Sequence, residues 1–211
     1  MAVITISRQF GSGGKALGKM LADELGYVFA DSNIVTKIAQ AANVSETWVE
    51  NVEKEAGGKL SRVISRMVSK GLVDKVLKDE YGYIDEEIYL DYLVVMIAQI
   101  AEEGNVVIMG RGSQYILRDH PDAIHILLVN EFENRVKFVM EHNDIPYNKA
   151  AQMVRSEDKR RASLYKKIGK TDYDRPDLYD LMLNMAELDL DTAKNMVMDL
   201  VRAKFKKNVT A

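Results

Sequence analysis

Apolar residues along the chain gather into short runs that alternate with longer segments of helical periodicity. Short apolar runs predict five strands, at residues 3–6, 27–30, 106–109, 124–129 and 178–184. Helical spacing of apolar residues, with breaks at glycine or proline, predicts helices from about Ala16 to near Gly26, and over 85–103, 133–142, 146–167 and 189–206. Strands separated by helices predict an α/β fold with a doubly wound parallel sheet, which binds ligands at the carboxyl ends of its strands.

The segment 34–103 is the one long interruption of this alternation. Its pattern is almost wholly helical, with breaks at Gly57-Gly58 and Gly71. Its last helix, 85–103, is apolar enough to pack on a sheet, and Gly104 ends it. We therefore expect a single domain whose core comprises about 1–33 and 104–211, with a helical insertion at about 34–103.

Composition narrows the classes of protein that this pattern allows. A chain of 211 residues with 47% hydrophobic content is suited to one α/β domain. The net charge of −3 argues against a general nucleic-acid binder, and the absence of cysteine excludes disulfides and thiolate metal sites. With no basic leader and only short apolar runs, we expect a soluble, cytoplasmic protein that does not contact membranes. The sequence leaves the oligomeric state open.

A glycine-rich loop separates the first strand from the first helix. Gly11, Gly13 and Gly14 are followed at once by Lys15 and Ala16. This order brings backbone N–H groups, a helix N-terminus and a lysine to one point, which is the arrangement that binds phosphate.

Two phosphate-binding motifs compete for this loop. As G-x-G-x-x-A, residues 11–16 match a dinucleotide-binding loop, and Asp31 lies 20 residues after Gly11, where a ribose-binding acidic residue is expected. However, residues 7–10 make the loop longer than a dinucleotide turn, and Lys15 is suited to the terminal phosphates of a triphosphate.

The P-loop motif G-x-x-x-x-G-K-[ST] is met only in part. Gln9 occupies the first glycine position, and Ala16 replaces the hydroxyl that would bind Mg²⁺. Ser12 or Ser7 could supply that hydroxyl by another route.

The motifs together resemble the cytidylate kinase-like proteins, relatives of the nucleoside monophosphate kinases. The resemblance rests on residues 4–15, on Gly110-Arg111-Gly112, on residues 158–162 with Tyr165, and on residues 179–184. It implies a P-loop kinase fold with a five-stranded parallel sheet, an acceptor-binding helical insertion, and a basic lid at about 146–175. It also implies ATP and Mg²⁺ as cofactors, and a small phosphorylated acceptor, a nucleoside monophosphate such as CMP.

The resemblance also assigns roles to individual residues. The donor phosphates would be bound by Gly11, Ser12, Gly13, Gly14, Lys15 and Ala16, with Ser12 a candidate ligand of Mg²⁺. The catalytic cations would be Lys15 and the lid residues Arg160 and Arg161, and the acceptor would be bound by Asp31, Ser32, Lys37 and Arg111. Eight basic and four acidic residues between Arg155 and Arg175 give the lid a local charge of +4.

Other interpretations of these residues stay open. A charged run is often a solvated helix face, Arg111 could pair with a carboxylate, and Asp31 could cap a helix. Ala16, together with Gly112 at a position that is aspartate in cytidylate kinase, allows a second function: a catalytically weak, nucleotide-binding regulatory protein. A dinucleotide-binding oxidoreductase is a third and less favoured function.

Overall fold

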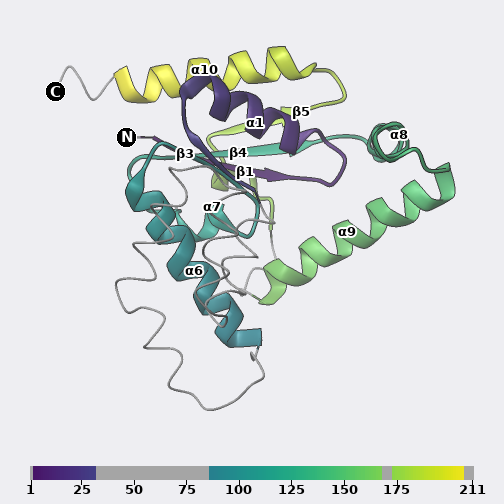
Figure 1. Cartoon of the computed structure of the whole chain (residues 1–211), viewed down its shortest axis with the longest axis horizontal. Coiled ribbons are helices and arrows are strands. Elements are labelled where there is room, and N and C mark those ends of the chain that lie inside the picture. Colours follow the sequence, from purple (N-terminus) through teal and green to yellow (C-terminus); the bar gives the residue numbers. More distant parts are fainter. Residues whose placement is uncertain (1, 32–85, 168–172, 207–211) are drawn as a thin grey trace, which may run out of the picture.

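The computed structural model describes residues 2–31, 86–167 and 173–206. Its centre is a sheet of five parallel strands in the order β2-β3-β1-β4-β5 (Figure 1). The strands are β1 (Val3–Arg8), β2 (Val28–Ala30), β3 (Val106–Met109), β4 (Ala123–Val129) and β5 (Leu181–Asn184). The expected α/β fold with a parallel, doubly wound sheet is confirmed.

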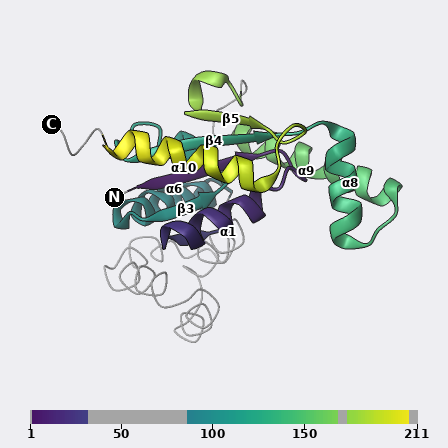
Figure 2. The ribbon, with the colours of Figure 1, turned by 90° about the horizontal axis from the view of Figure 1, so that it is seen from above.

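Helices cover both faces of this sheet. They are α1 (Gly14–Leu25), α6 (Glu86–Glu103), α7 (Ser113–Ile116), α8 (Phe132–Asn143), α9 (Tyr147–Lys167) and α10 (Leu190–Lys206). Helices α1 and α10 lie together on one face, α6 and α7 lie on the other, and α8 and α9 cross each other in contact beyond the strand ends (Figures 1 and 2).

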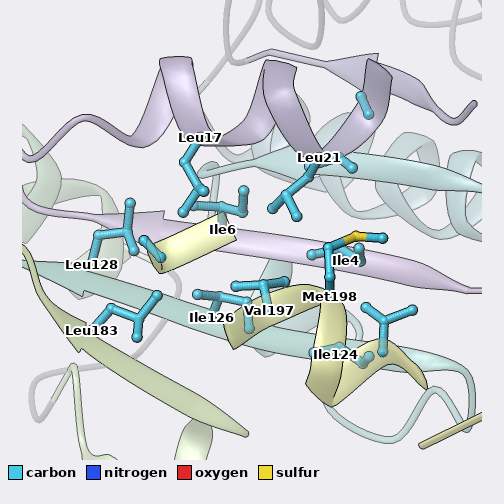
Figure 3. Close-up of a cluster of buried hydrophobic side chains, with 14 residues drawn as sticks. Ile4, Ile6, Leu17, Leu21, Ile124, Ile126, Leu128, Leu183, Val197 and Met198 are labelled. Carbon is cyan, nitrogen blue, oxygen red and sulfur yellow. The ribbon is translucent and has the colours of Figure 1, made fainter. Parts of the chain in front are cut away.

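The main core lies between the sheet and the α1–α10 layer, because alternate residues of the central strands point to that face. Ile4 and Ile6 of β1 are fully buried there, beside Ile124 and Ile126 of β4. Figure 3 shows these side chains meeting Leu17, Leu21, Val197 and Met198 from the two helices. Strands buried on both faces explain the continuous apolar runs in the sequence.

The structure differs from the sequence prediction at the last strand. Residues Pro176–Leu178 form a 3-10 turn, and the strand begins only at Leu181. The preceding residue, Asp180, contacts β4 twice at His125: its amide donates to the carbonyl of His125 at 2.8 Å, and its carboxylate accepts a hydrogen bond from the amide of His125 at 2.7 Å. The short helix α7 was not expected from the sequence. Most of the expected insertion, residues 34–85, lies outside the described residues, so the domain boundaries remain a prediction.

None of the described helices combines the length and the apolar character needed to cross a membrane.

The packing of the central sheet predicts how two substitutions affect stability. Ile126→Ala removes a fully buried side chain and leaves a cavity, so we expect a loss of about 2–5 kcal/mol in the free energy of unfolding. Met182→Ala on the edge strand is the control, because its side chain is 40% exposed, and we expect a loss below about 1 kcal/mol. Urea unfolding of both variants measures the difference. Equal losses would contradict the description of the core.

Burial of His125 predicts a pH dependence of stability. Its ring is 8% exposed and its Nδ1 lies 2.7 Å from the hydroxyl of Thr5, and burial lowers the pKa of this imidazole despite the nearby carboxylate of Asp180. The folded protein therefore resists protonation of His125, whereas the unfolded chain binds a proton below about pH 6.5. The stabilising effect is complete above that pH and is lost as the pH falls. Urea unfolding at pH 8.0 and 5.5 should show a smaller difference for His125→Gln than for the wild type; an equal difference would contradict it.

Candidate active site

The glycine loop between β1 and α1 has the backbone geometry of an anion site. Gly11 and Gly13 have φ values of 85° and 82°, a conformation that side chains disfavour. Gly13 is the N-cap of α1, and neither a capping side chain nor an acidic residue occupies the first turn. The first N–H groups of a helix have no partner within it, so this end of α1 can donate several hydrogen bonds to a phosphate group.

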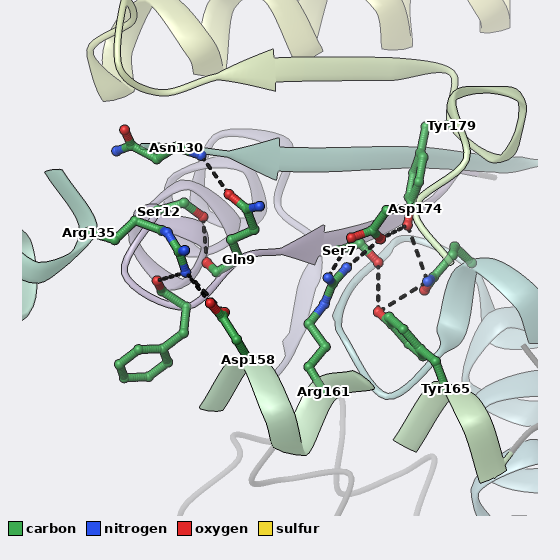
Figure 4. Close-up of polar contacts among 12 residues, drawn as sticks. Ser7, Gln9, Ser12, Asn130, Arg135, Asp158, Arg161, Tyr165, Asp174 and Tyr179 are labelled. Carbon is green, nitrogen blue, oxygen red and sulfur yellow. Dashed lines mark hydrogen bonds and ion pairs between the residues drawn. The ribbon is translucent and has the colours of Figure 1, made fainter. Parts of the chain in front are cut away.

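Packing around the loop explains both its glycines and its departure from the P-loop motif. A Cβ on Gly11 would lie 2.8 Å from the carbonyl oxygen of Arg135, so a side chain has no room there. Gln9, which replaces the first glycine of the motif, connects the loop to the end of β4 through two hydrogen bonds. Its amide donates to the carbonyl of Leu128, and its Oε1 accepts from the amide of Asn130 at 2.9 Å (Figure 4).

Lys15, in the first turn of α1, extends toward solvent with 71% of its side chain exposed, and its Nζ lies 3.6 Å from the carboxylate of Asp31. Asp31 follows β2 and is 13% exposed, so the end of β2 and the phosphate loop meet through this ion pair. The hydroxyl of Ser12 is buried and donates to the carbonyl of Gln9 at 2.7 Å, which closes the loop on itself.

The turn that carries Arg111 is unusual in its backbone. Gly110, Arg111 and Gly112 all have positive φ values, of 72°, 58° and 72°. An arginine in this region costs about 1 kcal/mol or more, and such strain is typical of functional sites. Gly112 is the left-handed N-cap of α7, which gives a physical reason for glycine where cytidylate kinase has aspartate.

The two lid arginines lie in different environments on α9. Arg161 is 15% exposed and forms two hydrogen bonds, of 2.5 and 2.6 Å, with the carboxylate of Asp174 (Figure 4). Arg160 is 65% exposed and pairs with Glu157 at 3.2 Å. The structure therefore places Arg161 inside the molecule and Arg160 at its surface.

A buried polar cluster surrounds the inner end of the lid helix. The side-chain amide of Gln114 donates to the hydroxyls of Tyr165 and Tyr179 at 3.2 and 3.3 Å, and the hydroxyl of Tyr179 donates to Asp174 at 2.8 Å. Burial raises the pKa of Tyr179 well above its usual range, so this phenol stays protonated. The hydroxyl of Ser7, at the end of β1, lies 3.5 Å from that of Tyr165.

Sequence reasoning missed Arg135, which joins the lid to the loop. The side chain is 7% exposed; its Nη1 lies 2.9 Å from both carboxylate oxygens of Asp158 and 3.3 Å from the carbonyl of Phe10 (Figure 4). The ring of Phe10 also packs against the α8–α9 core. An arginine in a charged helix is usually at the surface, so no pattern in the sequence marked this one.

Arg8, the last residue of β1, was also missed. Its aliphatic part packs over Gly14, where a Cβ would lie 3.0 Å from the arginine Cγ, and its guanidinium packs against Gly110. Burial lowers the pKa of this guanidinium, and the nearby charges of Arg161 and Arg111 act in the same direction. A charged residue at the end of an otherwise uncharged strand was the available signal.

The acidic residues near the glycine loop bear on how a nucleotide and its Mg²⁺ could be held. No group of three or more acidic or histidine side chains that could hold a metal occurs in the described parts of the chain. Mg²⁺ bound to a nucleotide needs only one or two carboxylates, because phosphate oxygens and water complete its shell. Asp31 can supply one such ligand. Ser32 and Lys37 lie outside the described residues, and their expected roles remain predictions.

Comparisons with known proteins agree with this geometry. A curated cytidylate kinase from Ignicoccus hospitalis is 24% identical over 203 residues, which cover 94% of this chain and 100% of that protein. Among solved structures, an uncharacterised protein from Eubacterium ventriosum matches with a TM-score of 0.68, 20% identity, and coverage of 95% of this chain and 98% of its own. A gluconokinase from Sinorhizobium meliloti matches with a TM-score of 0.52, 12% identity, and coverage of 100% and 97%.

The fold, a five-stranded parallel sheet between layers of helices, is of the P-loop kinase type, and its match to the gluconokinase extends over the whole chain. The family model described as the cytidylate kinase-like family matches residues 3–187, which is most of the chain. The protein therefore belongs to the cytidylate kinase-like family.

Proposed function

We propose that the protein is an ATP-dependent phosphotransferase that moves the γ-phosphoryl group to a small phosphorylated acceptor, a nucleoside monophosphate such as CMP. One observation carries this proposal: two glycine-containing segments, each with a cationic side chain, follow the ends of neighbouring parallel strands. The loop with Lys15 follows β1, and the turn with Arg111 follows β3, which pairs with β1 in parallel register. The curated relative named as a cytidylate kinase supports the choice of acceptor class.

The donor would bind at the loop. The amides at the start of α1 would surround its phosphates, and the exposed Lys15 would turn from Asp31 to the β and γ phosphates. Mg²⁺, when bound with ATP, would neutralise charge on the phosphate oxygens. Asp31 is positioned to contact the ion or its water, and Ser12 could do so only by giving up its hydrogen bond to Gln9.

The acceptor would bind at Arg111, with its phosphate oxygen facing the donor. In the transfer, a new bond forms between this oxygen and the γ phosphorus while the bond from phosphorus to the β-phosphate oxygen breaks, releasing ADP. Because a phosphate monoester is already largely ionised near pH 7, no general base has to remove a proton. Catalysis therefore depends on positioned cations, which the site provides.

The lid would complete the cationic surroundings. We infer that Arg161 exchanges its bond to Asp174 for one to the transferred group, because it is the lid arginine already held near the ends of β1 and β3. Arg160 would act only if closure of α9 brings it inward.

The strand order argues against the dinucleotide alternative. In a dinucleotide-binding fold, the first strand is adjacent to the second, and the acidic residue after the second strand reaches the ribose. Here β3 lies between β1 and β2, and Asp31 pairs with Lys15. The regulatory alternative retains one observation in its favour, which is the missing hydroxyl at Ala16.

Phosphotransfer tests the proposal directly. Purified protein with ATP and Mg²⁺ should convert at least one nucleoside monophosphate of a panel to its diphosphate, and Lys15→Met should lower kcat by about 100-fold or more. Lys19→Met, an exposed lysine one turn further along α1, is the matched control and should keep wild-type rates. No diphosphate product above that of Lys15→Met with any acceptor would refute the enzyme proposal.

Calorimetry separates the enzyme from the regulatory alternative. We expect ATP affinity to increase when Mg²⁺ is added, because the ion would be held jointly by phosphate and Asp31. Binding of ATP that is indifferent to Mg²⁺, without turnover, would favour the regulatory protein.

The lid assignment predicts unequal effects of two neighbouring substitutions. Arg161→Lys should lower kcat by at least about 10-fold, since a lysine loses the two-pronged contact with phosphate, whereas Arg160→Lys should change kcat less than about threefold. Asp174→Asn is the control: it removes the ion pair with Arg161 but keeps the arginine, so its kcat measures the effect of losing that pair alone. Equal effects at positions 160 and 161 would contradict the assignment.

A further inference from the structure

Arg8 bridges the two phosphate sites that the proposed function requires. Its stem lies over Gly14 of the donor loop, and its guanidinium lies on Gly110, next to Arg111. The amide of Gly110 in turn donates to the carbonyl of Ile6 at 3.0 Å, which fixes this turn against β1. The charged end of Arg8 is therefore directed away from the glycine loop and toward the turn after β3.

The charges around Arg8 are unbalanced. Burial is the main cause that disfavours its positive charge, and Arg161 and Arg111 act in the same direction, whereas Tyr165 and Glu157 oppose them; Arg161 is already paired with Asp174. No hydrogen bond or ion pair joins the guanidinium of Arg8 to any residue that the structure describes. Holding a half-buried cation beside two others is unfavourable unless an anion binds among them.

The helix that follows the Arg111 turn, α7, carries buried polar groups without hydrogen-bond partners among the described residues. The hydroxyl of Ser113 and the side-chain oxygen of Gln114 are fully buried and have no hydrogen-bond partner among the described residues. Both residues belong to α7, whose first residue follows the Arg111 turn directly. Buried groups without partners are rare in folded proteins and commonly mark a missing ligand or water.

We propose that Arg8 is a specificity-determining residue that binds, together with Arg111, the anionic group of the acceptor. This inference rests on the proposed function and assigns Arg8 to the phosphomonoester of its acceptor. Two guanidiniums, one at the end of β1 and one in the turn after the neighbouring β3, match the charge of a phosphate dianion and can share its oxygens through their planar donor groups. A carboxylate is the other compact anion that such a pair could hold, and it carries only one charge.

Steady-state kinetics of Arg8 variants separate acceptor binding from donor binding. For Arg8→Met, we expect the KM for the acceptor to rise at least about 10-fold while the KM for ATP changes less than about threefold. Arg8→Lys should recover part of the loss, because it restores charge without the two-pronged contact. The control is Arg202→Met, an exposed arginine on α10 that pairs with Asp199 far along the chain from the site. An unchanged KM for the acceptor, or an equal rise for ATP, would overturn the inference.

Equilibrium binding keeps the inference testable without turnover. Inorganic phosphate and CMP, each without ATP, should raise the thermal unfolding midpoint of the wild type and of Arg202→Met, and should raise that of Arg8→Met much less. Two controls accompany this measurement: circular dichroism checks that Arg8→Met is folded, and a shift of its unfolding midpoint by ATP checks that the donor site is intact. Equal protection of the wild type and Arg8→Met by phosphate would refute the role of Arg8 even if kinase activity is found.

Gluconate distinguishes a site for phosphate from a site for a carboxylate. Gluconate, a carboxylate with several hydroxyl groups, should give less protection than phosphate at equal concentration. If gluconate protects and phosphate does not, the acceptor class is wrong. If phosphate protects through Arg8 but no acceptor is phosphorylated, the anion site stands and the proposed enzyme activity fails.

Discussion

The pairing of β1 with β3 on one side and β4 on the other is the constraint on which the site depends. Because all three strands run parallel, their carboxyl ends reach the same edge of the sheet, and three functional segments leave from that edge. The glycine loop leaves β1, the Arg111 turn leaves β3, and helices α8 and α9 follow β4. Ile4 and Ile6 fix the register of β1, since a shift of one residue would turn them away from the core that they share with α1 and α10.

The glycine loop and the lid are joined mechanically. Phe10 inserts its ring against the α8–α9 core, and Arg135 holds both the carbonyl of Phe10 and the carboxylate of Asp158. One turn further along α9, the pair of Arg161 and Asp174 fixes the same part of this helix. Two neighbouring ion pairs therefore hold the second half of α9 against the rest of the molecule.

The sequence predicted the elements that depend on local patterns and missed the contacts that depend on distant ones. Continuous apolar runs located β1, β3 and β4, and Gly11 and Gly13 marked the loop, because each signal is contained within a few residues. The extension of the last strand to residue 178 was wrong, since Asp180 bonds His125 across the sheet, a contact between residues 55 positions apart. Arg135 was missed for the same reason.

One consequence of the position of Arg8 concerns the evolution of such chains. Gly14 and Gly110 lie far apart in the sequence, yet both face the same arginine side chain, and a Cβ at either position would press against it. A smaller residue at position 8 would free Gly14 from this contact, whereas Gly110 would stay restricted by its own φ of 72°. Variation at position 8 is therefore coupled to variation at position 14 and leaves position 110 a glycine.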